Sequence, residues 1–316
     1  MRVIILGKGL MLANIILGAI DAGAEICGVF RYEHTCKNHL KLLLKDIFYP
    51  EKEVTLIKQL KLNQIRLKSA NSSTFRKILL TKNIDMVFVG TWKERIKKET
   101  FDIPTIGTVN VHPSLLPKYR GPNPYIQTIL NGEKHTGVTL HLVDEGYDTG
   151  AILSQEKIDI LNTDTSKELR ERTVRTARKM VCELIKDLDT KIITPIEQSP
   201  KYATYYPNIS GKEKMLDFTY QTSEEILRTV RALYPFLPCY ITYKDKFFIA
   251  DPYNMQVLIT DTGSAAAGDI IAKNPEKLSL TIVCKDKKAI KFSNLKLYKL
   301  PFMTRKFIEQ RVRTAF

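Results

Sequence analysis

The strongest constraint on this chain is an apolar, β-branched run that ends at a proline and carries two polar side chains at alternate positions. The run extends from Ile106 to Val111 without helical spacing, which predicts a strand. Alternate side chains of a strand point to one face, so Asn110 and His112 share a side. Pro113 keeps His112 out of the helical basin and ends the strand. An amide and an imidazole at the carboxyl edge of a sheet can both donate to an oxygen that gains negative charge, as acyl transfer requires.

A second strand and an acidic loop supply a carboxylate for this pair. Residues 138–143 form another buried apolar run, and the following loop contains Gly146 and Gly150, which permit close approach of backbone to a ligand. Asp148 lies in this loop and is expected to meet His112 and fix its tautomer. Each polar side chain taken alone fits a capping, core or loop role. We favour a site because the three residue types occur together at strand ends.

The opening of the chain predicts an α/β fold. A strand at 2–6, an apolar helix at 10–22 and a strand at 25–30 form a β-α-β unit. Such a unit is typical of a doubly wound, mostly parallel sheet. Leu12 stands where a dinucleotide fingerprint needs its third glycine, so NAD binding is only weakly indicated.

Chain length and turn signals predict two domains. The 316 residues exceed what one core usually holds. A stretch with three prolines and a glycine at 191–214 is the expected linker between a catalytic domain at 1–190 and a smaller domain at 215–316. The second domain contains several short strands at regular spacing, which predicts a small β-barrel.

Charge and cysteine usage narrow the partners and the compartment. The net charge of +15 favours a phosphate-bearing partner such as tRNA or a nucleotide sugar, although solvated surface lysines explain it equally well. The five cysteines are spread singly without CxxC or metal spacing, which indicates a reducing, cytoplasmic compartment. A signal peptide is an alternative interpretation of residues 2–24, but Gly7 and Gly9 interrupt the apolar run. No later run reaches the ~18 apolar residues of a membrane span, so we expect no membrane partner.

Three separated motifs carry a family resemblance. Residues 110–121, 137–139 and 144–150 resemble, in order, the 10-formyltetrahydrofolate-dependent formyltransferases, which include enzymes acting on methionyl-tRNA and on nucleotide-linked amino sugars. The resemblance implies a Rossmann-like catalytic domain followed by an OB-like barrel, with 10-formyltetrahydrofolate as the formyl donor. It also implies that Asn110, His112 and Asp148 are the catalytic residues.

The resemblance implies further contacts with donor and acceptor. Lys118 and Arg120 are expected to meet acceptor phosphate, or to be exposed loop charges. Trp92 is expected either to stack on the folate or to pack in the core. The full set of expected donor contacts is Gly90, Thr91, Trp92, Ile96, Ser114, Leu115, Leu116, Pro117, Asp144 and Gly146. We predict no metal: a zinc site from His112, His141 and Asp148 lacks a closely spaced ligand pair.

The acceptor is the least constrained prediction. Methionyl-tRNA is favoured by the net charge, the two-domain length and the predicted barrel. Residues 7–9 and 31–35 depart from the turn and basic loop of the tRNA-formylating enzymes, which favours a nucleotide-linked amino sugar. Hydrolysis of the formyl-folate, and RNA binding by an inactive scaffold, are further alternatives. The lysine-rich segment 31–68 either contacts phosphate or forms a solvated helix face.

Overall fold

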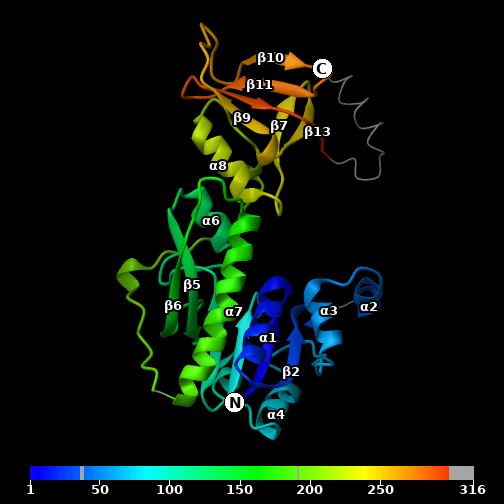
Figure 1. Cartoon of the computed structure of the whole chain (residues 1–316), viewed down its shortest axis with the longest axis vertical. Helices are drawn as coiled ribbons and strands as arrows, with labels where there is room; N and C mark the ends of the chain where they lie inside the picture. The colour runs from blue at the N-terminus through cyan, green and yellow to red at the C-terminus, as the bar shows by residue number, and fades with distance from the viewer. Residues whose placement is uncertain (36–38, 191, 299–316) are drawn as a thin grey trace. The chain divides into compact units, whose positions relative to one another are not determined.

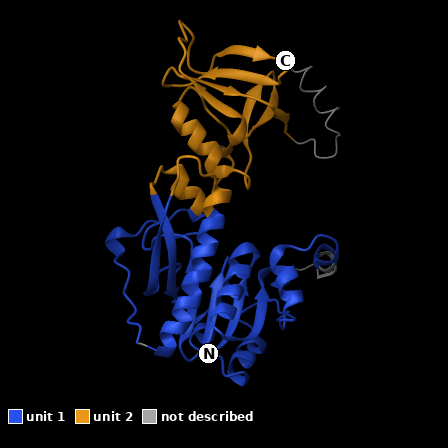
Figure 2. Cartoon of the chain, viewed as in Figure 1, with its two compact units in different colours: residues 1–124, 135–159, 170–206 blue, residues 125–134, 160–169, 207–316 orange. Residues whose placement is uncertain are grey.

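Two compact units make up the computed structural model (Figures 1 and 2). The structure describes residues 1–35, 39–190 and 192–298. Unit 1 contains residues 1–124, 135–159 and 170–206, and unit 2 contains residues 125–134, 160–169 and 207–316. The units interleave along the chain, whereas the predicted division at 191–214 is continuous. The predicted domain boundaries therefore stay a prediction.

A six-stranded sheet forms the centre of unit 1 (Figure 1). In hydrogen-bonded order its strands are β2 (Glu25–Arg31), β1 (Arg2–Gly7), β3 (Met86–Gly90), β4 (Gly107–His112), β5 (His135–Leu142) and β6 (Ile152–Asp159). The β2-β1, β1-β3 and β3-β4 pairs are parallel, and the β4-β5 and β5-β6 pairs are antiparallel. The predicted mostly parallel α/β sheet is confirmed. Its antiparallel half begins at the strand that carries Asn110 and His112.

Helices cover both faces of this sheet, because alternate strand residues are apolar on each side. On β1, Val3 and Ile5 belong to one core and Ile4 and Leu6 to another. Helices α1 (Gly9–Asp21), α3 (Lys52–Gln59) and α7 (Ser166–Thr190) contribute to the first core. Helices α4 (Ser73–Thr81) and α5 (Lys98–Phe101) contribute to the second core. The sheet is thus the middle of three layers, which leaves the carboxyl edge of its parallel strands open for a site.

The segment after β2 contains the 3₁₀ turn η1 (Tyr32–Thr35) and helix α2 (His39–Phe48). A helix is thus present in the lysine-rich segment 31–68, and residues 36–38, just before it, lie outside the described residues. Arg31, at the end of β2, is buried and donates to both carboxylate oxygens of Asp46 on α2. A buried, bidentate pair of this kind holds α2 against the end of β2.

Unit 2 is built on two antiparallel sheets. One has the order β10 (Ile270–Asn274), β11 (Ser279–Val283), β12 (Ala289–Phe292), β9 (Met255–Leu258), and the other β13 (Lys296–Leu297), β8 (Lys246–Ala250), β7 (Cys239–Tyr243). Unit 2 also contains helix α8 (Ser223–Leu233), the turns η3 (Lys212–Lys214) and η4 (Pro252–Asn254), and helix α6 (Pro124–Leu130) apart from its first residue. The turn η2 (Pro200–Tyr202) belongs to unit 1. Thr222 and Glu225 form a capping box that begins α8. Among the described residues, no helix is both long and apolar enough to cross a membrane.

Candidate functional site

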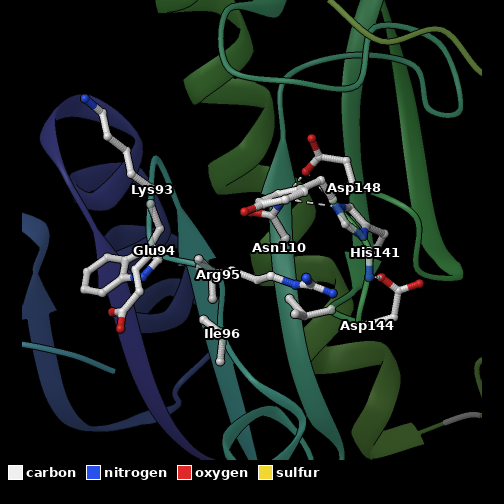
Figure 3. Close-up of a pocket in the computed structure, with 13 residues that line it drawn as sticks. Lys93, Glu94, Arg95, Ile96, Asn110, His141, Asp144 and Asp148 are labelled. Atoms are coloured by element: carbon white, nitrogen blue, oxygen red, sulfur yellow. Dashed lines mark hydrogen bonds and ion pairs between the residues drawn. The ribbon is translucent and has the colours of Figure 1, made fainter. Parts of the chain in front are cut away.

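A cavity of about 90 Å³ opens beside the carboxyl ends of β3 and β4 (Figure 3). Three segments line it: the end of β3 with the turn that follows, the β4-β5 strand pair, and the acidic loop after β5. The lining residues are Val89, Trp92, Lys93, Glu94, Arg95, Ile96, Asn110, His141, Val143, Asp144, Gly146, Tyr147 and Asp148. This position is the edge at which open α/β sheets hold ligands.

The register of β4 and β5 places four polar side chains on one face of the sheet. Asn110 lies directly opposite His141, and His112 lies directly opposite Thr139. Opposed residues of an antiparallel pair share a face, as do residues two apart on a strand. The predicted shared side of Asn110 and His112 follows from this ladder.

The three predicted catalytic side chains meet at one oxygen. Asp148 Oδ1 accepts a hydrogen bond from Asn110 Nδ2 at 3.1 Å, and His112 Nδ1 lies 3.5 Å from the same oxygen. The carboxylate of Asp148 is mostly buried, with 17% of its side chain exposed, so the hydrogen bonds it accepts are only partly screened by water. The structure therefore brings the amide, the imidazole and the carboxylate together, although they converge on Asp148 and not on an empty point.

Three hydrogen bonds, from Gly121 and from Gln198, hold the Asp148 loop. Gly121 N donates to Asp148 Oδ2 at 2.9 Å. Gly121 has φ +112° and a Cβ there would lie 2.3 Å from the carbonyl oxygen of Tyr206, so only glycine fits. Gln198 Nε2 donates to the carbonyl oxygens of Asp148 (3.0 Å) and Gly150 (2.8 Å). These bonds fix Asp148, whose own φ is +55°, in a conformation that non-glycine residues rarely adopt.

His112 lies behind Asp148 and is absent from the cavity lining. Its side chain is buried, and Nε2 is 2.9 Å from the carbonyl oxygen of Tyr119. A carbonyl oxygen only accepts, so Nε2 carries the hydrogen, and Nδ1 donates to Asp148 when the ring is protonated. The predicted direct contact between His112 and an oxyanion stays a prediction, and the geometry favours action through Asp148.

His141 is a site residue that the sequence marks only as a member of the disfavoured zinc set with His112 and Asp148. It is buried, lines the cavity, and places Nε2 3.0 Å from Asn110 Nδ2 and Nδ1 2.8 Å from the carbonyl oxygen of Leu142. Burial, and then the neighbouring charge of His112, lower the pKa of His141 to about 4. A neutral ring forms no ion pair with Asp148, 3.8 Å away. The available sequence signal was a histidine inside an apolar strand, two residues after Thr139.

In the turn after β3, the side chain of Glu94 is anchored to residues 69–71, and the side chain of Arg95 lines the cavity. Thr91 begins the turn with φ +59°. The Glu94 carboxylate accepts hydrogen bonds from Ser69 Oγ, from Ala70 N at 2.9 Å and from Asn71 Nδ2 at 3.0 Å. Arg95 reaches across the cavity opening (Figure 3), with its guanidinium 5.7 Å from the centre of the Tyr147 ring.

Four of the expected donor contacts in the turn and in the acidic loop line the cavity, and two others do not. Trp92, Ile96, Asp144 and Gly146 are lining residues, while Gly90 and Thr91 connect β3 to the turn. The Trp92 ring packs edge-on against Phe30 and Tyr32, at 5.1 and 5.3 Å between ring centroids. The structure thus gives Trp92 a packing role, and stacking on folate stays a prediction.

The loop from Ser114 to Arg120 does not line this cavity. Ser114 Oγ donates to the carbonyl oxygen of Lys118 at 2.8 Å, and Leu116 N donates to Thr139 Oγ1 at 3.2 Å. Leu115 and Pro117 lie in the same loop, so the folate contacts expected of residues 114–117 stay predictions. Lys118 is exposed. Arg120 instead donates twice to Gln198 Oε1, at 3.2 and 2.7 Å, which commits its guanidinium to the support of the Asp148 loop.

Comparison with known protein families agrees with this arrangement. The Formyl transferase model matches residues 1–185, and the model of the Formyl transferase C-terminal domain matches residues 208–310. This chain belongs to the formyl transferase family. The predicted folate-dependent N-formyltransferase, with 10-formyltetrahydrofolate as its donor, is confirmed at the level of the family.

Relatives of this formyltransferase include curated proteins and solved structures. The methionyl-tRNA formyltransferase of Bacillus subtilis is 30% identical over 244 residues, 76% of this chain and 74% of that protein. Among solved structures, the Helicobacter canadensis N-formyltransferase in complex with folinic acid and dTDP-3-aminofucose has a TM-score of 0.64 at 19% identity, covering 94% of this chain and 99% of that one. HypX from Aquifex aeolicus in complex with tetrahydrofolic acid has a TM-score of 0.62 at 16% identity, covering 95% of this chain and 44% of that one. The two structures share the fold of the formyltransferase.

Proposed function

We propose that this formyltransferase moves the formyl group of 10-formyltetrahydrofolate to the amino group of methionyl-tRNA. The observation that carries formyl transfer is the presence, in one cavity, of an amide nitrogen and a carboxylate supplied by Asn110 and Asp148. The acceptor is favoured by methionyl-tRNA formyltransferases of about 30% identity that match up to 90% of the chain, and by the net charge of +15.

In the proposed reaction, the neutral amine of the acceptor attacks the formyl carbon. The electron pair of the carbonyl bond moves to oxygen, and the oxyanion accepts a hydrogen bond from Asn110 Nδ2. Asp148 takes the proton of the new ammonium and returns it to N10 of the folate as the carbon–N10 bond breaks. The products are the formamide and tetrahydrofolate. His112, behind Asp148, supports the carboxylate in this exchange.

We propose that the donor's pterin end enters beside the turn after β3. Ile96 gives this wall an apolar surface, and the backbone of the 144–148 loop lies opposite. Asp144 is committed to its own loop, since Oδ1 accepts from Gly146 N at 2.9 Å and from Thr149 Oγ1 at 2.6 Å.

A nucleotide-linked amino sugar is the second candidate acceptor. Three basic groups of the 31–68 segment are engaged within the protein: Arg31 with Asp46, Lys45 with Glu51, and Lys58 with the carbonyl oxygen of Asp46. Side chains held in this way are less available to the phosphates of tRNA. This observation supports a smaller acceptor, as does the sugar-bound relative from Helicobacter canadensis.

Formyl incorporation tests both acceptors directly. Purified protein and 10-formyltetrahydrofolate are incubated with initiator methionyl-tRNA or with a panel of nucleotide-linked amino sugars, and the formylated product is measured. We expect formyl-methionyl-tRNA, with acceptor affinity that falls steeply as salt rises. Product from a sugar alone would replace the tRNA proposal with the second candidate. Donor loss equal in the presence and absence of every amine would indicate hydrolysis and overturn both.

We also propose a cytoplasmic location. The proposal requires that the formyl donor is present in the same compartment as the protein. The described cysteines are all free thiols, as expected in a reducing compartment: Cys27, Cys182, Cys239 and Cys284. Labelling of the native and unfolded protein with a thiol reagent under non-reducing conditions tests the second point, because a disulfide would lower the count in the unfolded protein.

A further inference from the structure

The side chain of His141 is the direct cross-strand neighbour of Asn110. The β4-β5 register pairs the two residues, and both line the cavity (Figure 3). His141 is 2% exposed, so the hydrogen bonds of its ring are shielded from water. Any control that His141 exerts on the reaction therefore passes through the amide of Asn110.

The hydrogen bonds around His141 define its tautomer. Nδ1 is 2.8 Å from the carbonyl oxygen of Leu142, which only accepts, so Nδ1 carries the ring hydrogen. In the neutral ring Nε2 is then an acceptor, and it takes a hydrogen from Asn110 Nδ2 at 3.0 Å. Burial keeps the ring neutral, because it lowers the pKa of His141 to about 4.

This acceptor fixes the direction of the Asn110 amide. Asn110 Nδ2 faces two acceptors, His141 Nε2 at 3.0 Å and Asp148 Oδ1 at 3.1 Å. If the amide were rotated by 180°, its oxygen would face His141 Nε2 and Asp148 Oδ1. All three atoms are acceptors, so none of them would be paired, which is costly where little water can reach them. With one amide hydrogen held by His141, the other is shared between Asp148 and any negative oxygen that forms in the cavity.

We propose that His141 is a positioning residue for formyl transfer, which anchors one hydrogen of the Asn110 amide so that the other reaches the oxyanion. The inference rests on the proposed function, because it assigns Asn110 as the oxyanion donor. When Asp148 Oδ1 takes the proton of the attacking amine, it becomes a poorer acceptor for Asn110. The shared second hydrogen is then bound mainly by the oxyanion, and the amide keeps its direction because the first hydrogen stays on His141.

A double-mutant cycle separates this role from a structural one. His141→Phe keeps an aromatic ring but removes the acceptor, and it is combined with Asn110→Ala. Single-turnover rates are measured with enzyme in excess over the formyl donor, and binding of folinic acid is measured separately. We expect His141→Phe to slow transfer about tenfold in the native background and to have no further effect in the Asn110→Ala background.

Two further variants complete the design. His141→Gln, whose side-chain oxygen can accept from Asn110, is expected to restore most of the lost rate. His135→Phe is the matched control on the same strand, since His135 is exposed and pairs with Asp159, and it is expected to leave the rate unchanged. Equal losses from His141→Phe in both backgrounds would overturn the positioning role, because a purely structural defect does not depend on Asn110.

Nitrogen NMR of the histidine side chains tests the hydrogen bonds without any acceptor substrate. We expect His141 to show the neutral form with hydrogen on Nδ1 at neutral pH. Hydrogen on Nε2, or a charged ring, would overturn the inference. A native protein that transfers no formyl group to any amine would overturn the proposed function itself, whereas an additive cycle in an active protein would overturn the role of His141 alone.

Discussion

The β4-β5 strand pair and the turn after β3 border the same cavity, but they hold their side chains by different means. Asn110 and His141 are opposed by a backbone ladder, so their relative position is set by strand register. The turn from Thr91 to Lys97 has no such ladder and depends on the carboxylate of Glu94 and on Asn71, whose Oδ1 accepts from Lys97 N at 2.7 Å. We therefore expect a side-chain replacement in the strand pair to lower the rate of formyl transfer. A replacement in the turn should instead weaken binding of the donor.

The largest effect is expected at the strand pair and its acidic loop. Asn110→Ala and Asp148→Asn should each lower turnover by about 10²- to 10³-fold, because the first removes an oxyanion donor and the second removes the proton acceptor. Asp159→Asn is the matched control, since Asp159 is an exposed carboxylate on β6. Steady-state formyl transfer measures the effect. Folded Asn110→Ala protein with normal turnover would contradict the assignment.

The ladder also explains which parts of the site could be predicted from the sequence. Asn110, His112 and Asp148 stand at strand ends or in the loop after a strand, and their convergence required only alternation and strand adjacency. His141 could not be predicted as a partner of Asn110, because their contact depends on antiparallel pairing of β4 and β5. The apolar sequence of one strand does not show whether its neighbour is parallel or antiparallel. The core strands and helices of unit 1 were similarly predictable, because each must present apolar residues at a regular spacing to be buried in an α/β fold.

The turn resisted prediction for a physical reason. Glu94 binds residues 69–71, more than twenty positions earlier, and Arg120 binds Gln198, far downstream. Such side-chain contacts across the chain leave no periodic signal. No sequence pattern therefore indicates that Gln198 holds the backbone of Asp148. Arg120 was predicted only as a candidate phosphate ligand, because it is a basic residue in a loop.

The next largest effect is expected in the pH dependence of stability at the strand pair. The unfolded pKa of a histidine is near 6.5 and that of folded His141 is about 4, so the unfolded chain binds the proton first. The contribution of His141 is therefore complete above pH ~6.5 and is lost as the pH falls toward about 4; at pH ~5 the loss is about 2 kcal/mol. Urea unfolding followed by Trp92, the single tryptophan, measures it in unit 1. His141→Gln should flatten this part of the profile, and an unchanged slope would count against the buried neutral ring.

Gln198→Leu should lower turnover by about tenfold, because it releases the carbonyl oxygens of Asp148 and Gly150 and frees Arg120. The effect should fall on turnover more than on donor affinity, since the loop positions the carboxylate. Gln256→Leu, at an exposed position on β9, is the control. If only donor affinity changed, the 144–150 loop would serve donor binding, as the turn does, and the proposed difference between the two regions would be contradicted.

At the turn itself, Glu94→Gln should weaken donor binding about fivefold and leave turnover at saturating donor nearly unchanged. Glutamine keeps the size of the side chain but loses the charge that strengthens the bonds from Ala70 N and Asn71 Nδ2. Quenching of Trp92 fluorescence by folinic acid provides the affinity, and Glu99→Gln on α5 provides an exposed control. An equal loss of turnover would show that the turn also sets the chemistry.

The smallest effect is expected outside both regions, at Lys118. Its side chain is exposed, and a single exposed phosphate contact contributes roughly twofold to affinity at moderate salt. If methionyl-tRNA is the acceptor, Lys118→Gln should reduce the slope of log affinity against log salt by about one unit, because one fewer counterion is released. Lys77→Gln on α4, another exposed lysine, controls for the change in net charge. An identical slope in the two variants would remove Lys118 from the acceptor surface. Because this readout needs no turnover, it tests the acceptor independently of the strand pair and of the turn.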